Sequence, residues 1–252
     1  MPSASTNKPA PGGRAGDARV ALRGILVPIN PDDSGHAMSS KTRIKTYDRI
    51  VQESLDLFNQ QGERNITTNH IAAHLGISPG NLYYHFRNKE EIVYQIFLQY
   101  RTFITERLGM DASQKMTVDD LVNYLDTAFQ AMWRFRFMFY DLPGLLARNP
   151  QMQTEYQQFV NTEMRSILAG HFREFIRLGL LCMDDEDVEA VSINIWLVVK
   201  FWFAFEQTAR PRAPITEEAG HRGVRQVLAL LKPFIQAEFR DGFRRLYDRY
   251  PC

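Results

Sequence analysis

The chain has 252 residues, a formal net charge of +1 at pH 7 and a hydrophobic share of 44%. This length accommodates one large domain or two small ones. The near-neutral charge excludes a nucleic-acid binder that relies on a global positive field, so any such field has to be local. Two distant cysteines, Cys182 and Cys252, exclude a disulfide framework and a cysteine-based zinc site, as in a reducing cytoplasm.

The chain lacks the usual signs of membrane insertion or secretion. It has no run of eighteen apolar residues, and the apolar stretch at 24–29 is too short for a signal core. We therefore expect a soluble cytoplasmic protein. Residues 1–40 are rich in Pro, Gly, Ser and Ala without a helical period, which predicts a disordered N-terminal extension. The change of composition near Met38 raises the hypothesis that residues 1–37 do not belong to the native protein.

From residue 41 the pattern becomes helical. Apolar residues recur at steps of three and four up to Gly62, which predicts an amphipathic helix. Lys41, Arg43 and Lys45 crowd its start. These cations form either a solvated helix terminus or a basic arm that touches phosphates or a minor groove.

Residues 67–89, TTNHIAAHLGISPGNLYYHFRNK, predict two short helices joined by a tight turn. Thr67 or Thr68 is an N-cap, Gly76 suits a left-handed helix end, and Ser78 followed by Pro79 starts the second helix. This order is typical of a helix-turn-helix, in which the second helix lies in a DNA major groove. An αα-corner without DNA is the alternative. Asn88 caps a third helix, and Glu91 completes a capping box.

The remaining chain also reads as helical. A long helix covers 90–110, Thr117 caps the next, and the aromatic segment after it predicts a helix end and a short helix beyond Asp141. Asn149 and Pro150 start a long helix that Gly179 ends. Aspartates open another helix at 184–187, whose apolar run 193–205 predicts burial on more than one face. The last helix covers 217–248, and Pro233 should kink or split it near residue 231.

These residues together resemble the TetR family of bacterial transcriptional regulators. The match covers about 45–100 and rests on a dense set of positions: Phe58, Gly62, Thr68, Ile71, Ala72, Gly76, Ile77, Ser78, Leu82, Tyr83, His85, Phe86, Asn88, Lys89 and Ile92. A weaker likeness lies in the segment FYDLPGLLARNP. The resemblance implies an all-α protein, with an N-terminal three-helix helix-turn-helix domain at 41–90 and a C-terminal helical effector-binding and dimerisation domain at 91–252. The long N-terminal extension departs from the family.

The resemblance also implies roles for single residues. Positions that face base edges are Pro79, Gly80, Asn81 and Tyr84. Positions that contact or approach phosphates are Arg43, Lys45, Thr67, Thr68, Asn69, Tyr83, His85 and Lys89. Hydroxyls, helix N-termini and a fixed cation are suitable phosphate partners. The apolar spacing instead assigns Ile71, Leu75, Leu82 and Phe86 to the core.

The aromatic residues of the C-terminal part have two interpretations. They form plain core, or they line a pocket for a small hydrophobic or aromatic effector. The candidate pocket residues are Trp133, Phe137, Tyr140, Phe159, Asn194, Trp196, Lys200, Trp202 and Phe203. Because a buried lysine needs a partner, Lys200 raises the hypothesis of an anionic head group on the ligand.

Other candidate chemistry is weak. His70 and His74 are spaced for one helix face but lack a third metal ligand, so two surface histidines are the better interpretation. We find no nucleophile–base pair, and we expect no cofactor and no enzymatic activity. The sequence thus predicts a homodimer, paired through its last two long helices, that represses a near-palindromic double-stranded DNA operator until an effector releases it. An activator or effector-independent regulator is the alternative, and an all-α enzyme or a helical interaction module is a remote one.

Overall fold

The computed structural model describes residues 46–109, 118–211 and 214–250. Within these ranges all regular structure is helical, with no β-strand and one isolated bridge, between Leu181 and Ile235. The predicted all-α class is therefore confirmed. The predicted N-terminal extension, the basic positions Arg43 and Lys45, and the cap at Thr117 lie outside the described residues.

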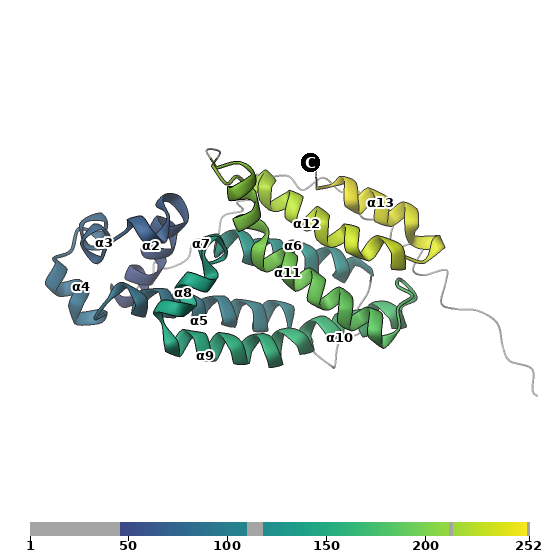
Figure 1. The fold of residues 1–252 in the computed structure, drawn as a ribbon, viewed down its shortest axis with the longest axis horizontal. Helices are drawn as coiled ribbons and strands as arrows, with labels where there is room; N and C mark the ends of the chain where they lie inside the picture. Colours follow the sequence, from purple (N-terminus) through teal and green to yellow (C-terminus); the bar gives the residue numbers. More distant parts are fainter. Residues whose placement is uncertain (1–45, 110–117, 212–213, 251–252) are drawn as a thin grey trace, which may run out of the picture.

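Three helices gather at one end of the molecule (Figure 1). They are α2 (Thr46–Gln61), α3 (Thr68–Leu75) and α4 (Pro79–His85), with the short 3-10 turn η1 (Glu63–Asn65) after α2. Their apolar faces meet in a small core whose central side chains are fully buried: Ile50, Phe58, Ile71 and Leu82. The apolar stripe of α2 thus packs against α3 and α5, and α3 in turn packs against α4.

Helix α5 (Lys89–Leu108) joins this end to the rest of the protein. Its 20 residues span about 30 Å, and it packs against α2 at one end and against α6 and α9 further along. Asn88 caps it as predicted, since its side chain accepts from the Glu91 N–H at 2.9 Å. The predicted capping box was wrong in its second half, because the Glu91 carboxylate accepts from the N–H of Arg87 rather than of Asn88.

The larger body consists of the remaining helices. They are α6 (Val118–Arg134), α7 (Arg136–Tyr140), α8 (Leu142–Arg148), α9 (Pro150–Phe159), η2 (Val160–Met164), α10 (Arg165–Arg177), α11 (Asp185–Ala209), α12 (Glu217–Leu231), η3 (Lys232–Phe234), η4 (Ala237–Phe239) and α13 (Arg240–Asp248). In Figure 1, α9 and α10 run along one side, α12 and α13 along the other, and α11 crosses between them.

Several predicted helix ends are confirmed. Asn149 caps α9 by accepting from the Met152 N–H, and Gly179 ends the helical run with a φ of 72°. Between these ends, η2 is a π-helical segment that the sequence did not predict. Pro233 lies in η3, where the last predicted helix splits into α12 and α13.

Helix α11 differs from its predicted environment. The sequence predicts burial on more than one face, yet Ile193, Leu197, Phe201 and Phe205 are 41–57% exposed. They recur every four residues and so form one stripe along the outside of the helix. Other residues of α11 pack on α7, α10 and α12. The prediction therefore holds for the faces that contact these helices and fails for the stripe, because apolar composition does not reveal which face is covered within the same chain.

By length and composition, α11 is also the one helix among the described residues that is long and apolar enough to cross a membrane. It nevertheless packs into the body through an ionic contact as well as apolar ones. Arg222 on α12 donates twice to the buried carboxylate of Glu206, at 3.1 and 2.6 Å. These hydrogen bonds hold the pKa of Glu206 below its ordinary value.

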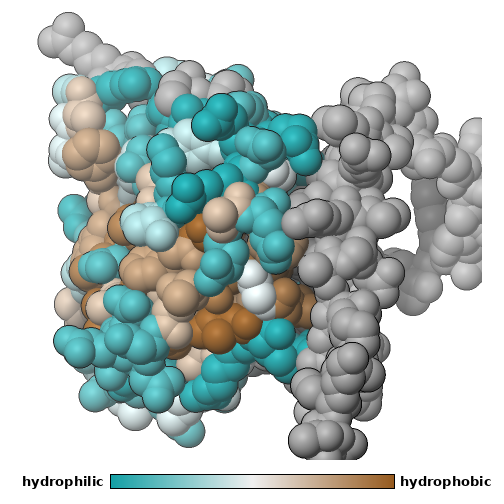
Figure 2. Space-filling model, turned by 90° about the vertical axis from the view of Figure 1, so that its right-hand side faces the viewer, coloured by the Kyte–Doolittle hydropathy of each residue, from teal (hydrophilic) through white to brown (hydrophobic). Residues whose placement is uncertain are grey.

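The end of the body remote from α2–α4 has its own apolar cluster. Buried residues from α10, α11 and the η3–η4 region form it, among them Phe175, Val188 and Ile235. Seen from that end, Figure 2 shows apolar surface in the middle, bordered by hydrophilic side chains. The main core, in contrast, runs continuously from the small N-terminal domain into the body.

Candidate nucleic-acid interface and ligand cavity

Capping contacts define the start of α3 and the turn between α3 and α4. The Thr67 hydroxyl accepts from the His70 N–H at 3.3 Å, while the His70 ring accepts from the Thr67 N–H at 3.4 Å. Gly76 ends α3 in the left-handed conformation, at φ 65° and ψ 31°. The Ser78 hydroxyl accepts from the Asn81 N–H at 3.1 Å and so caps α4. Local contacts therefore fix the start of α3, and Gly76 and Ser78 fix the turn.

One side of α4 is exposed where the sequence predicts base contacts. Pro79, Gly80 and Asn81 are exposed, and Tyr84 is 84% exposed. On the opposite side, Leu82 is fully buried in the core. This separation leaves one face of α4 free for a major groove, whose dimensions admit an α-helix.

The predicted phosphate-contacting hydroxyls lie together beside this face. The Thr68 hydroxyl and the Tyr83 hydroxyl are 3.0 Å apart and hydrogen-bonded, and Tyr83 is 50% exposed. Thr67 and Asn69 are exposed at the start of α3. His85 is half-buried, and the edge of its ring meets Tyr84 at a centroid distance of 5.1 Å. The structure thus brings five of the eight predicted phosphate-contacting residues to neighbouring positions around α3 and α4.

Lys89 has a different environment. Its ammonium lies 2.8 Å from the Glu63 carboxylate and also donates to the Glu63 carbonyl at 2.8 Å. Two of its three donors are therefore used inside the protein. The other carboxylate oxygen of Glu63 accepts from Arg148 on α8 at 2.8 Å. Lys89 primarily holds the start of α5 against η1, which sequence spacing did not reveal.

The two spaced histidines also have separate roles. His74 Nε2 lies 3.1 Å from the Glu53 carboxylate, whereas His70 belongs to the cap of α3. The described ranges contain no group of three side chains that suits a metal ion.

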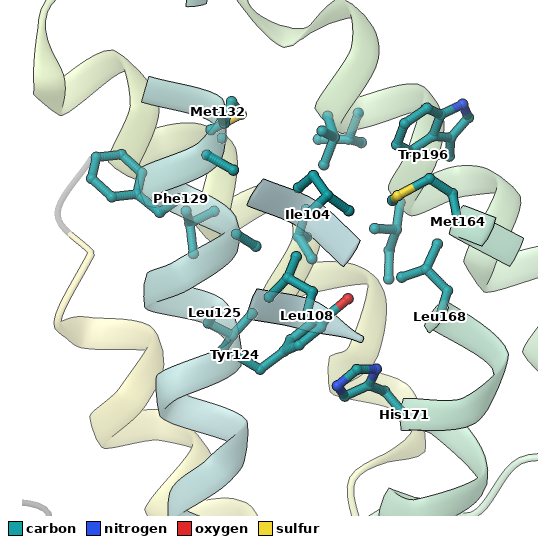
Figure 3. Close-up of a pocket in the computed structure, with 18 of the residues that line it drawn as sticks. Ile104, Leu108, Tyr124, Leu125, Phe129, Met132, Met164, Leu168, His171 and Trp196 are labelled. Carbon is teal, nitrogen blue, oxygen red and sulfur yellow. The ribbon is translucent and has the colours of Figure 1, made fainter. Parts of the chain in front are cut away.

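The body encloses an apolar cavity of about 90 Å³ between α5, α6, α10, α11 and α12. Figure 3 shows Tyr124, Leu125, Phe129 and Met132 on one side of it and Met164, Leu168 and His171 on the other. Other lining residues include Tyr100, Ile104, Leu108, Phe172, Phe175, Ile195, Trp196, Val199, Trp202, Gly223 and Val224. None of the described lining residues is Lys, Arg, Asp or Glu, so the cavity suits an uncharged molecule.

The predicted pocket and the observed cavity share only Trp196 and Trp202. The other predicted aromatic residues pack elsewhere in the core, with Phe137, Phe159 and Phe203 at most 2% exposed. Trp133 and Tyr140 pack edge-on or tilted around Phe203. These residues therefore do not line this cavity. Trp133, Phe159 and Phe203 fill space between helices, whereas Phe137 and Tyr140 border a separate pocket beside Glu63 and Arg64.

The two polar residues of the predicted pocket also lie away from the cavity. Asn194 is exposed, and Lys200 is half-buried with its ammonium 5.1 Å from the ring centre of Phe201. Neither lines the cavity. The anionic head group predicted from Lys200 therefore has no support at this site.

Glycines on α12 allow aromatic rings to approach closely. A Cβ at Gly223 would lie 2.6 Å from Trp202 Cδ1, and one at Gly220 would lie 2.6 Å from Phe129. The Trp202 indole N–H donates to the Ala219 carbonyl at 2.6 Å. These close contacts fix the positions of Trp202 and Phe129 in the cavity wall.

Sequence reasoning missed the polar end of the cavity. His171 is buried, its Nδ1 lies 2.7 Å from the Ile167 carbonyl, and its ring packs on Tyr124 at a centroid distance of 4.1 Å. Burial lowers the pKa of His171 and raises that of Tyr124, so both side chains are neutral near pH 7. A histidine on the apolar face of a predicted helix was the available signal.

Comparison with known proteins identifies the family of both halves of the chain. A family model described as "Bacterial transcriptional repressor" matches residues 99–243, and one described as "Bacterial regulatory proteins, tetR family" matches residues 50–96. The first alone covers more than half of the chain. The chain belongs to the TetR family.

Individual TetR relatives agree with this. A TetR-family regulator from Marinobacter aquaeolei VT8 is 39% identical over 82% of this chain and 99% of its own, with a TM-score of 0.74. The Staphylococcus epidermidis regulator IcaR, a negative transcriptional regulator of the biofilm operon icaADBC, is 24% identical over 75% of this chain and 98% of its own. The Mycobacterium tuberculosis regulator KstR2 shares the fold, at 22% identity, a TM-score of 0.54, and 77% and 96% coverage.

TetR-family proteins are DNA-binding transcription factors rather than enzymes. The predicted family, the absence of enzymatic activity and the general function as a DNA-binding regulator are thereby confirmed.

Proposed function

We propose that this TetR-family regulator is a homodimeric repressor that binds a near-palindromic operator and leaves it when a small hydrophobic effector fills the cavity. The observation that carries the proposal is the exposed face of α4, which is held in place by a buried opposite face. The name of the relative IcaR, a negative regulator, favours repression over activation.

On this proposal, the exposed face of α4 and the residues beside it form a DNA-reading surface. Different residues of this surface contact bases and phosphates. Asn81 hydrogen-bonds a base edge, Tyr84 contacts a thymine methyl group, and Pro79 and Gly80 allow the backbone to approach the groove. The hydroxyls of Thr67, Thr68 and Tyr83, with Asn69 and His85, contact phosphates on either side. Arg43 and Lys45 add phosphate contacts from the preceding arm. Lys89 acts by positioning α5 through Glu63 and has one remaining donor for a phosphate.

The exposed stripe of α11 is proposed as the centre of the dimer interface. Four large apolar side chains in one row are unusual on a monomer surface. A two-fold axis allows one such stripe to cover its own copy, because the same patch then serves both subunits. Asn194 lies beside Ile193 and Leu197 on the exposed side and can hydrogen-bond across the axis. Helix α12 packs beside α11 and would flank this contact.

The cavity is proposed as the effector site, since its walls connect to both functional surfaces. Helix α5 lines the cavity through Ile104 and Leu108 and begins beside the reading surface at Lys89. Helix α11 lines it through Trp196 and Trp202 and carries the proposed dimer stripe. An effector that binds more tightly to the dimer with one spacing between its two α4 helices shifts the population towards that spacing. A soluble cytoplasmic location follows, because the DNA is available there.

Two measurements on the full chain test this function. Analytical ultracentrifugation should give a dimer, and a mobility-shift titration should give salt-sensitive binding to the DNA upstream of its own gene, about 10³-fold tighter than to random DNA. A monomer without preference for that DNA or for any sequence selected from a random pool would refute the proposal. Increased transcription from the bound promoter in a purified transcription assay would instead identify an activator.

A further inference from the structure

The polar groups of the cavity are few. Most of the wall is aliphatic or aromatic carbon. The indole N–H of Trp202 is already used by the Ala219 carbonyl, and Figure 3 shows the indole nitrogen of Trp196 pointing away from the middle of the cavity. Apart from the Tyr100 hydroxyl on α5, the available polar side chains are therefore Tyr124 and His171.

The hydrogen bond to Ile167 fixes what His171 offers to a ligand. A carbonyl oxygen can only accept, so Nδ1 carries the ring proton in this contact. In the neutral ring, Nε2 is then a lone-pair acceptor. Burial lowers the pKa of His171, and Tyr124, which packs on the ring, adds no charge. The acceptor on Nε2 is thus available at neutral pH.

Tyr124 supplies the complementary group. Burial raises the pKa of its hydroxyl, which therefore stays protonated and can donate. In Figure 3 its hydroxyl points across the cavity, at the same end as the His171 ring. Among the described residues no hydrogen bond joins these two side chains. Besides the Tyr100 hydroxyl, the cavity consequently presents one acceptor and one donor side by side in an apolar surrounding.

We infer that the cavity selects a neutral, small apolar molecule that carries a hydroxyl group, an alcohol or a phenol, which donates to His171 Nε2 and accepts from the Tyr124 hydroxyl. A carbonyl group can only accept and would leave Nε2 without a donor. A carboxylate would in addition bring an unpaired charge into a cavity without described cations. A pure hydrocarbon would leave both polar groups unpaired. This inference rests on the proposed effector site.

Phenol and toluene form a matched pair of probes, since they differ by a hydroxyl in place of a methyl group. The cavity of about 90 Å³ is of the order of those that hold a benzene-sized molecule. Calorimetric titration of the full chain should show binding of both and none of benzoate. In Tyr124→Phe and His171→Phe, phenol affinity should fall by about tenfold, the effect of an unpaired buried hydroxyl, while toluene affinity stays within about twofold.

The outcomes separate the inference from the proposed function. If toluene binds and phenol does not, or if Tyr124→Phe weakens both ligands equally, the hydroxyl selection is overturned and the effector site survives. If neither probe binds, both fail. A measurement on the unmutated chain covers the case in which His171→Phe does not fold. Phenol, but not toluene, should shift the ¹⁵N resonance of His171 Nε2, and an unchanged resonance with bound phenol would overturn the inference.

Discussion

Glu63 and Arg148 meet across the boundary between the small N-terminal domain and the helical body, with Glu63 Oε2 2.8 Å from Arg148 Nη2. The same carboxylate pairs with Lys89, so one buried acid ties η1 to both α5 and α8. Removal of the acid leaves two cations behind, whereas removal of Arg148, which is 36% exposed, leaves the Lys89 pair intact.

We therefore expect Glu63→Ala to lower the free energy of unfolding by about 3 kcal/mol, as for a buried pair that loses one partner. Arg148→Ala should cost about 1 kcal/mol or less, in the range of exposed pairs. Guanidinium unfolding of both variants measures this, with Glu106→Ala on the exposed side of α5 as the control. Equal losses for Glu63→Ala and Arg148→Ala would contradict the central position of Glu63.

Tyr84 and Tyr83 provide a test of base against phosphate contacts. Tyr84→Ala should weaken operator binding by about tenfold or more and leave binding to random DNA nearly unchanged, because a base contact contributes about 1–3 kcal/mol. Tyr83→Phe removes only the hydroxyl that pairs with Thr68, and it should weaken both DNAs by a similar, smaller factor. Fluorescence anisotropy at two salt concentrations measures both. A uniform loss for Tyr84→Ala would show that it does not read bases.

The α11 stripe predicts the effect of a charge in the dimer interface. Leu197→Glu should convert the dimer to a monomer, because a carboxylate buried against its own copy has no partner. The matched control is Gln207→Glu, at an exposed position on another side of the same helix. Sedimentation velocity at micromolar concentration distinguishes them. A Leu197→Glu protein that stays dimeric would place the interface elsewhere.

His171 predicts a pH dependence of stability. Its pKa is lowered in the folded protein, so the unfolded chain binds a proton that the buried ring does not. Its stabilising contribution is complete above the unfolded pKa of about 6.5 and is lost as the pH falls below that value. Unfolding free energy should therefore decrease more steeply from pH 7.5 to 5.5 in the unmutated chain than in His171→Phe. Parallel curves of unfolding free energy against pH would show that protonation of the His171 ring does not destabilise the folded protein.

Gly223 predicts the effect of one added methyl group. Gly223→Ala places a Cβ 2.6 Å from Trp202 Cδ1, and Trp202 is held by its hydrogen bond to Ala219. We expect a loss of about 1–3 kcal/mol through overpacking and weaker binding of toluene. Gly80→Ala is the control for folding, since the nearest atom to its Cβ is 3.9 Å away. Unchanged stability in Gly223→Ala would mean that the indole moves freely.

The sequence predicted best what local contacts determine. The caps at Ser78 and Asn88 and the left-handed Gly76 depend on residues within one helical turn, and all three are confirmed. The family resemblance implied the exposed positions on α4, and the apolar spacing predicted the burial of Leu82.

The cavity depends on contacts that are distant in sequence, and it was predicted poorly. Whether a ring fills space or borders a void is decided by the helix opposite, so Phe159 and Trp196 are indistinguishable in the sequence. For the same reason, the sequence did not reveal that the α11 stripe is exposed or that His171 packs on Tyr124.

Asn59 on α2 accepts from the N–H of Phe137 and donates to the carbonyl of Arg134, so its amide closes the break between α6 and α7. Helix α6 carries Tyr124 and Phe129 on the cavity wall and ends at this amide. This side chain thus links a helix of the cavity wall to the small N-terminal domain. On the proposed function, a tilt of α6 on effector binding would be passed to α2 through this amide.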